Sequence, residues 1–210
     1  MDLPANDFRE WFEGSAFVDD NGQPIIWCHG TEAEPFNIFA MVEDGSMGFH
    51  FGSRGAALER LDGTDAGEDA RVVEVFCRAR KPLRLRDHFT WTMCSVVGEL
   101  EDLGVLKGDE GDAIYEACDD AMLFAVLERA GYDCIIYENE TERHGDSLLI
   151  WRPELIKAVD AGGFDREDPR IWPQRETDEG DWILHRNRVA DLERAHQELE
   201  ALPRTLEMFT

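Results

Sequence analysis

Basic residues are scarce in this chain. Lys and Arg number 21 against 46 Asp and Glu, so the formal net charge is −25 over 210 residues. A field of this sign repels nucleic-acid phosphates and anionic lipid headgroups. We therefore expect neither direct nucleic-acid binding nor membrane binding. The same field attracts a basic protein, which is one expected kind of macromolecular target; a solvated acidic surface that serves only solubility is the alternative interpretation.

Paired cysteines are also missing. The chain has five cysteines and none forms a C-x-x-C pair; they stand at Cys28, Cys77, Cys94, Cys118 and Cys134. An odd number at wide spacing argues against a disulfide framework and against a zinc site. Several stand among apolar residues, which predicts small buried side chains in a reducing compartment. We expect no bound metal.

Long apolar runs are absent too. No stretch approaches the roughly 18 apolar residues that a membrane-spanning helix needs. The first residues lack a basic region followed by an apolar one, so we expect no signal peptide and a soluble, cytoplasmic protein. Hydrophobic residues still make up 43% of the chain, which is enough for the core of one ordinary domain.

Local patterns predict an α+β fold. Phe8, Trp11 and Phe12 recur at helical spacing, and Asn21-Gly22 between two apolar runs is typical of a hairpin. Further strands are expected at 48–52, 71–80, 134–137 and 148–151, and helices at 54–61, 92–103, 112–130 and 188–202. This order predicts a small mixed sheet, split by helical insertions and followed by a C-terminal helix.

The pattern changes near residue 160. Residues 160–180 are rich in Asp, Gly and Pro, which is typical of a linker or an irregular wrap. We therefore divide the chain into a domain at 1–159 and a C-terminal part at 160–210. The apolar stripe of the last helix needs a partner, which is either the domain itself or another molecule.

Two histidines stand beside glycines at the ends of apolar strands. His29 follows the run Ile25–Cys28 and precedes Gly30, and His50 lies between Gly48 and Gly52. Glycine lets a ligand approach the backbone closely, and strand ends are common places for binding residues. Buried, hydrogen-bonded histidines are the alternative interpretation, and the spacing alone does not decide between them.

The order of several motifs carries more information. Residues 27–31 (WCHGT), 48–52 (GFHFG), 81–83 (KPL), 131–136 (GYDCII) and 145–157 (GDSLLIWRPELIK) resemble, in this order, segments of the diphtheria-toxin-like ADP-ribosyltransferases. The lead-in at 8–30 is similar to that of the subgroup found in phage and mobile-element (polyvalent) proteins, where a toxin-like or effector role is expected. The resemblance spans about residues 7–159.

This resemblance implies that NAD is the substrate and that the first motif binds it. In that family a histidine after the first strand hydrogen-bonds a ribose hydroxyl, and the resemblance gives this role to His29. The backbone of Gly30 then pairs with the nicotinamide carboxamide, and the hydroxyl of Thr31 adds a contact.

The second motif is implied to hold the nicotinamide ring. The family's stacking tyrosine corresponds to His50, whose imidazole can stack but would repel the cationic ring if it were protonated. Phe51 belongs to the same strand and is included in the binding set. Arg54, four residues after His50, is a candidate anion clamp.

The catalytic carboxylate of the family has no direct counterpart. Its position falls on Ser147, which cannot carry charge, and the neighbouring Asp146 lies on the opposite face of a regular strand. Asp146 and Ser147 are nevertheless the candidates for this catalytic position, together with His29 and His50. Glu138 and Glu140 are nearby carboxylates in the adjoining segment, where a solvated loop is the alternative interpretation.

Three hypotheses follow. The first is a mono-ADP-ribosyltransferase that modifies a macromolecule. The second is a weakened module on the same fold that binds NAD or ADP-ribose, or engages a protein through its charge, without transfer. The third rests on the two histidines and an arginine, which also resemble the phosphate grip of the tRNA 2′-phosphotransferases, but the acidic charge argues against a tRNA substrate.

Overall fold

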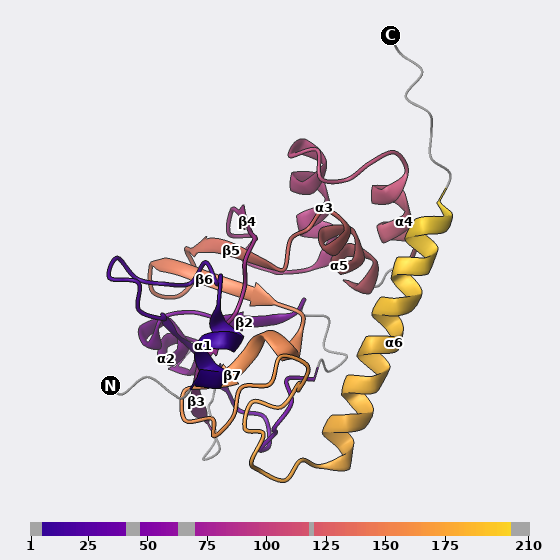
Figure 1. Ribbon diagram of the computed structural model, residues 1–210. Coiled ribbons are helices and arrows are strands. Elements are labelled where there is room, and N and C mark those ends of the chain that lie inside the picture. The colour runs from indigo at the N-terminus through magenta and orange to yellow at the C-terminus, as the bar shows by residue number, and fades with distance from the viewer. Residues whose placement is uncertain (1–5, 41–46, 63–69, 118–119, 203–210) are drawn as a thin grey trace.

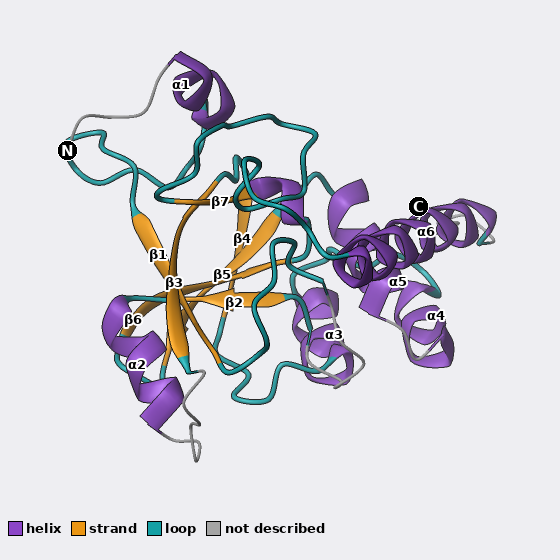
Figure 2. Ribbon diagram, turned by 90° about the horizontal axis from the view of Figure 1, so that it is seen from below, coloured by secondary structure: helices purple, strands orange, loops and turns teal. Residues whose placement is uncertain are grey.

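The computed structural model describes residues 6–40, 47–62, 70–117 and 120–202 and contains two small sheets (Figures 1 and 2). The first is antiparallel, in the order β1-β3-β7, with β1 at Ile26–Thr31, β3 at Arg71–Cys77 and β7 at Ile156–Ala158. The second has the order β2-β6-β5-β4, with β2 at Phe49–Phe51, β6 at Gly145–Ile150, β5 at Cys134–Asn139 and β4 at Pro82–Leu85. Only β4 and β5 run parallel among these pairs, which confirms the mixed α+β class.

A backbone bridge joins the two sheets. Cys28 and Gly52 exchange both N–H···O bonds at 2.9 Å. Beyond this bridge β2 pairs with β6, while β1 pairs with β3. The two sheets therefore separate at the ends of β1 and β2, which opens a space between them.

The helices fall into two groups, each with its own core. Helices α3 (Met93–Asp102), α4 (Glu110–Ala117) and α5 (Asp120–Arg129) come between β4 and β5, and the long α6 (Glu179–Ala201) packs on α5. Figure 2 shows these four together on one side of the strands. The other core is aromatic: α1 (Asn6–Phe12) places Phe8 against Phe76 and Phe164, with ring centroids 4.9 Å apart in both pairs. Helix α2 (Arg54–Asp62) packs on β1.

Several element bounds differ from expectation. The helix expected at 112–130 is two helices, α4 and α5. Strand β1 continues beyond the apolar run that ends at Cys28 and reaches Thr31, because its whole length pairs with β3. Helix α6 begins at Glu179 rather than near 188, and the Asp178 side chain caps it by accepting from the Gly180 N–H.

The segment between β7 and α6 wraps back onto the first sheet. Phe164 and Ile171 are buried in the aromatic core, and the Ile171 N–H donates to the Asn37 carbonyl at 2.8 Å. The Asn37 side-chain amide donates to the Trp172 carbonyl and to the Thr177 hydroxyl. The tail thus contacts the loop that follows β1.

Candidate functional site

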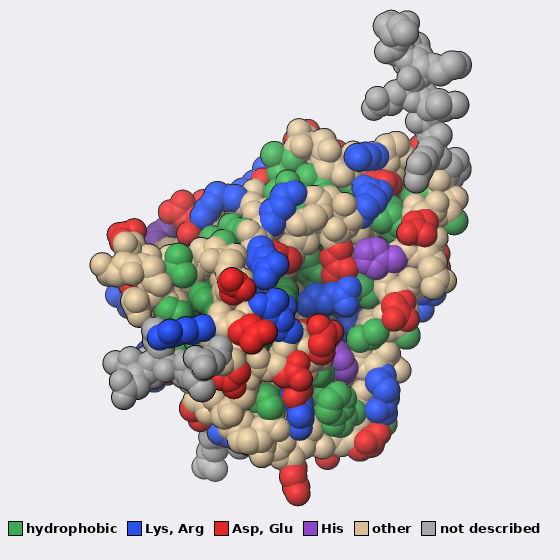
Figure 3. Space-filling model, viewed as in Figure 1, with side chains coloured by type: hydrophobic (Ala, Val, Ile, Leu, Met, Phe, Trp, Pro, Cys, Tyr) green, Lys and Arg blue, Asp and Glu red, His purple; other side chains and the backbone are tan. Residues whose placement is uncertain are grey.

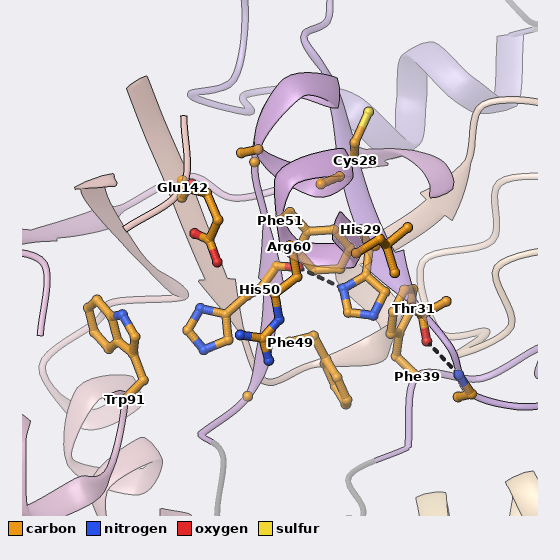
Figure 4. Close-up of a pocket in the computed structure, with 18 of the residues that line it drawn as sticks. Cys28, His29, Thr31, Phe39, Phe49, His50, Phe51, Arg60, Trp91 and Glu142 are labelled. Atoms are coloured by element: carbon orange, nitrogen blue, oxygen red, sulfur yellow. Dashed lines mark hydrogen bonds between the residues drawn. The ribbon is translucent and has the colours of Figure 1, made fainter. Parts of the chain in front are cut away.

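A cavity of about 810 Å³ lies where the two sheets separate. Its walls come from β1 and β2, helix α2, the loop after β1, the loop after β4, the β5–β6 segment and the start of α6. This size is within the range of small-molecule sites in proteins. Figure 4 shows its chemistry-bearing side chains.

His29 on β1 is fixed by one ring nitrogen and offers the other. Its Nδ1 lies 2.7 Å from the His50 carbonyl oxygen, which can only accept, so Nδ1 carries the proton. Burial lowers the pKa of His29, so the ring is neutral at pH 7. The ring packs against Phe39 and Phe51 with centroids 5.2 and 5.5 Å away. In the described part of the chain Nε2 has no partner and remains an acceptor facing the cavity.

His50 on β2 has both ring nitrogens occupied. Its Nε2–H donates to the Met47 carbonyl at 3.1 Å, and its Nδ1 accepts from the Tyr137 hydroxyl at 2.9 Å. Burial, aided by His29, lowers the pKa of His50 to about 4, so this ring is also neutral at pH 7. Trp91 lies beside it, with ring centroids 5.7 Å apart. His50 therefore presents an uncharged ring rather than an acid or a base.

Gly30 exposes backbone groups at the sheet edge. The N–H and C=O of Cys28 point toward Gly52. Backbone groups two residues apart in a strand point to the same side, so the N–H and C=O of Gly30 also point to this side, beyond the Cys28–Gly52 bridge. No partner for them is found among the described residues. Glycine is also required by packing, since a Cβ here would lie 2.4 Å from the Ala57 carbonyl oxygen of α2. Thr31 is buried, and its Oγ1 accepts from the Ala33 N–H at 3.1 Å.

The arginine that lines the cavity is not the expected one. Arg54 pairs with Glu74 at 2.6 Å, and its side chain is 62% exposed outside the cavity. Arg60, at the other end of α2, lines the cavity, and Figure 4 shows its guanidinium beside the ring of His50. Within the described residues no carboxylate pairs with Arg60. The sequence pattern missed it because a charged residue late in a helix is typical of a solvated face.

Ser147 and Asp146 lie on opposite faces of β6. Ser147 lines the cavity, is 2% exposed and pairs across the sheet with Tyr137. Asp146 faces away, and both its oxygens accept from the Arg84 guanidinium at 2.9 Å. Neither Glu138 nor Glu140 lines the cavity.

A family comparison agrees with this geometry. A family model described as ADP-ribosyltransferase in polyvalent proteins matches residues 19–165. The chain belongs to this family. No curated protein and no solved structure gave a match.

In this ADP-ribosyltransferase domain, Ser147 lies opposite Tyr137, the residue that hydrogen-bonds His50. The Ser147 hydroxyl accepts from the Asn139 side-chain amide at 3.1 Å. Tyr137 donates to His50, and His50 donates to Met47, so these two bonds lie along the same side of the cavity. Serine therefore has a structural task where the resemblance places a glutamate.

A carboxylate that sequence analysis missed also lines the cavity. Glu142 lies in the β5–β6 segment, is partly buried, and accepts from the Asn139 amide at 2.6 Å. Figure 4 shows its carboxylate directed into the same space as His50, Trp91 and Arg60. No local pattern marks it, because the run from Glu138 to Gly145 is uniformly polar.

Two residues outside the matched range complete the cavity wall. Asp181 and Leu184 of α6 line it beyond residue 165. Asp181 Oδ2 accepts from the N–H groups of Asn37 and Ile38, at 2.7 and 3.3 Å. The last helix of the ADP-ribosyltransferase chain therefore holds the loop that follows β1.

The cysteines of the described residues are free thiols. Cys28, Cys77 and Cys134 are buried free thiols, Cys94 is exposed, and Cys118 lies outside the described residues. In the described ranges no three His, Cys, Asp or Glu side chains are grouped to hold a metal ion. Nor do these ranges contain a helix with the length and apolar character needed to span a membrane.

Proposed function

We propose that this chain binds NAD in the 810 Å³ cavity and transfers its ADP-ribose to a macromolecular acceptor. The observation that carries the proposal is the pairing of a fixed, neutral His29 with the unpartnered backbone edge of Gly30 in the described structure. The first offers an acceptor for a ribose hydroxyl, and the second offers a donor and an acceptor that match a carboxamide. Thr31, buried next to them, shapes the same end of the site.

The nicotinamide ring lies near His50 in this proposal. A neutral ring does not repel the positive charge of the bound nicotinamide, and the low pKa of His50 keeps it neutral. Trp91 adds a second aromatic surface. Phe51 also lines the cavity and packs against the ring of His29, so it supports that ring at the binding site.

Arg60 takes the anion-binding role that the sequence analysis predicted for Arg54. NAD carries a pyrophosphate, and a guanidinium without a carboxylate partner in the described structure is a suitable donor for phosphate oxygens. Arg54 is held outside by Glu74.

The acceptor is proposed to be a basic protein. The net charge of −25 favours it, although the face in Figure 3 carries Lys and Arg side chains among the acidic ones rather than one continuous acidic patch. The buried free thiols are consistent with a reducing, cytoplasmic setting. The family links the chain to polyvalent proteins, and a role as an effector of a phage or mobile element belongs to the same proposal.

Two measurements on the purified full chain test this function: NAD binding by calorimetry, and nicotinamide release with and without lysate protein. We expect His29→Ala to weaken NAD binding about tenfold or more, the equivalent of about 1.4 kcal/mol, and to lower release in parallel. His144→Ala is the matched control, because His144 is exposed and does not line the cavity. NAD binding without any release would favour the module that binds but does not transfer, and equal binding by both variants would remove the proposed site.

A further inference from the structure

Cleavage of NAD requires negative charge near the ribose. When the bond between the ribose carbon and the nicotinamide nitrogen breaks, its electron pair leaves with nicotinamide and positive charge develops on the ribose. A fixed carboxylate stabilises that charge. Ser147 has no charge, and Asp146 is held outside by Arg84. If the proposed function holds, the site needs another carboxylate.

Among the described residues, five carboxylates line the cavity: Glu32, Glu34, Asp87, Glu142 and Asp181. Two of them are committed to backbone groups. Asp87 accepts from the N–H groups of Phe89 and Glu140, each at 2.8 Å, and Asp181 holds the loop after β1. Glu32 and Glu34 are exposed and follow the end of β1. Glu142 is the remaining carboxylate, and it lies on the side of the cavity that β6 forms.

Asn139 connects Glu142 to Ser147. The amide of Asn139 has two N–H groups, and one donates to Glu142 Oε2 at 2.6 Å while the other donates to Ser147 Oγ at 3.1 Å. Its carbonyl oxygen accepts from the N–H groups of Thr141 and Glu142, at 3.0 and 2.8 Å. Asn139 is 3% exposed and Ser147 is 2% exposed, so these two residues are buried, and the bonds fix the orientation of the Asn139 amide.

We propose that Glu142 is the catalytic carboxylate of this ADP-ribosyltransferase and that Asn139 positions it. The carboxylate comes from the β5–β6 loop and reaches the cavity beside the strand position that holds serine. In hydrolysis, Glu142 stabilises the positive ribose as nicotinamide leaves. It then takes a proton from the attacking water as the new C–O bond forms, and releases that proton to solvent. The products are nicotinamide, ADP-ribose and one proton. When a macromolecular acceptor replaces water, Glu142 takes the proton of the acceptor's nucleophilic group and releases it to solvent in the same way.

The first test compares Glu142→Gln with Asp146→Asn and Glu140→Gln in the full chain, by nicotinamide release and by NAD binding. Removal of a preorganised transition-state contact typically lowers turnover about 100-fold or more. We expect that loss for Glu142→Gln with NAD affinity within about threefold of wild type, and near wild-type turnover for both controls. Retention of most turnover by Glu142→Gln, or a loss confined to Asp146→Asn, overturns the assignment.

A second test does not depend on turnover. It compares the affinity of the chain for ADP-ribose with that for an ADP-linked pyrrolidine, whose ring nitrogen is positively charged near the reacting carbon. Wild type should prefer the cationic ligand, and Glu142→Gln should lose that preference while it keeps its affinity for ADP-ribose. If both proteins prefer the cationic ligand to the same extent, the catalytic role of Glu142 is overturned but the proposed NAD site is not. If wild type binds neither ligand, the proposed NAD site fails as well.

Asn139→Ala separates positioning from catalysis. Without the amide, the Glu142 carboxylate loses its tether, so the rate constant for release should fall while the KM for NAD changes little. Asn139→Asp cannot donate to Glu142 and should not restore the rate. Wild-type turnover in Asn139→Ala would contradict the positioning role.

Discussion

The two sides of the cavity are built in different ways. On the β1–β2 side, His29, Gly30 and His50 lie on strands that the backbone bridge at Cys28 and Gly52 holds in register. On the β5–β6 side, Glu142 lies in a turn whose conformation depends on one asparagine side chain. Strands fix a residue's direction by alternation, whereas a turn fixes it by a few specific hydrogen bonds. The order of motifs in the sequence therefore predicts the binding residues on the strands, but it does not predict the position of the Glu142 carboxylate.

The largest expected effect on the β1–β2 side comes from Gly30→Ala. The new Cβ would lie 2.4 Å from the Ala57 carbonyl oxygen, a backbone atom that cannot move aside. We expect a loss of about 3 kcal/mol of unfolding free energy, at the upper end for overpacking, and lost NAD binding. Urea denaturation measures the first and calorimetry the second.

Gly98→Ala is the control for this change. Gly98 lies in α3, and a methyl group added there would have nothing within 4 Å, so alanine should stabilise the helix slightly. Comparable stability of the two variants would mean that α2 does not pack tightly on β1.

The next effect compares two arginines of α2. Arg60→Ala should weaken NAD binding by about 2 kcal/mol, or roughly 30-fold, because a charge-assisted bond to phosphate is lost. Arg54→Ala should leave NAD affinity within about twofold, because its partner Glu74 lies outside the cavity. Calorimetry on both variants decides which arginine binds the anion, and the opposite order would return that role to Arg54.

These arginines show how far the sequence predicts the site. The motif order located β1, β2 and β6 and placed His29, His50 and Ser147 around one cavity. It named Arg54 and not Arg60, because which face of α2 meets the cavity depends on how the helix packs at Gly30. Nor did it reveal Glu142, because no spacing in a polar loop reflects the bonds of Asn139. The start of α6 was missed for a similar reason, since only the Asp178 cap marks it.

A smaller effect is a pH dependence that arises at His50. Its pKa is about 4 in the folded chain against an ordinary value of 6.5, so below pH 6.5 the unfolded chain binds a proton that the folded chain does not. Stability should therefore fall as pH decreases from 6.5 toward 4, by at most about 2 kcal/mol at pH 5. His29, whose pKa is lowered in the same direction, adds to this slope.

The measurement is urea denaturation of wild type and His50→Gln at pH 7.5 and pH 5. The variant should be less stable at pH 7.5, because the bonds to Met47 and Tyr137 are altered, but its stability should change less between the two pH values. If the variant loses as much stability as wild type between the two pH values, His50 is not the main source of the slope.

The smallest expected effect concerns the contact between the last helix and the cavity. Asp181→Asn keeps the size of the side chain but removes the charge that accepts from the N–H groups of Asn37 and Ile38. Bonds to a charged acceptor are stronger than neutral ones, so the loop should be held less firmly and NAD affinity should fall a few-fold. Asp191→Asn on the same helix is the control, since Asp191 pairs with Arg194 of α6 and does not line the cavity. Equal NAD affinity in both variants would show that the cavity does not depend on α6. A selective loss in Asp181→Asn would make residues beyond the matched range of 19–165 part of the binding site.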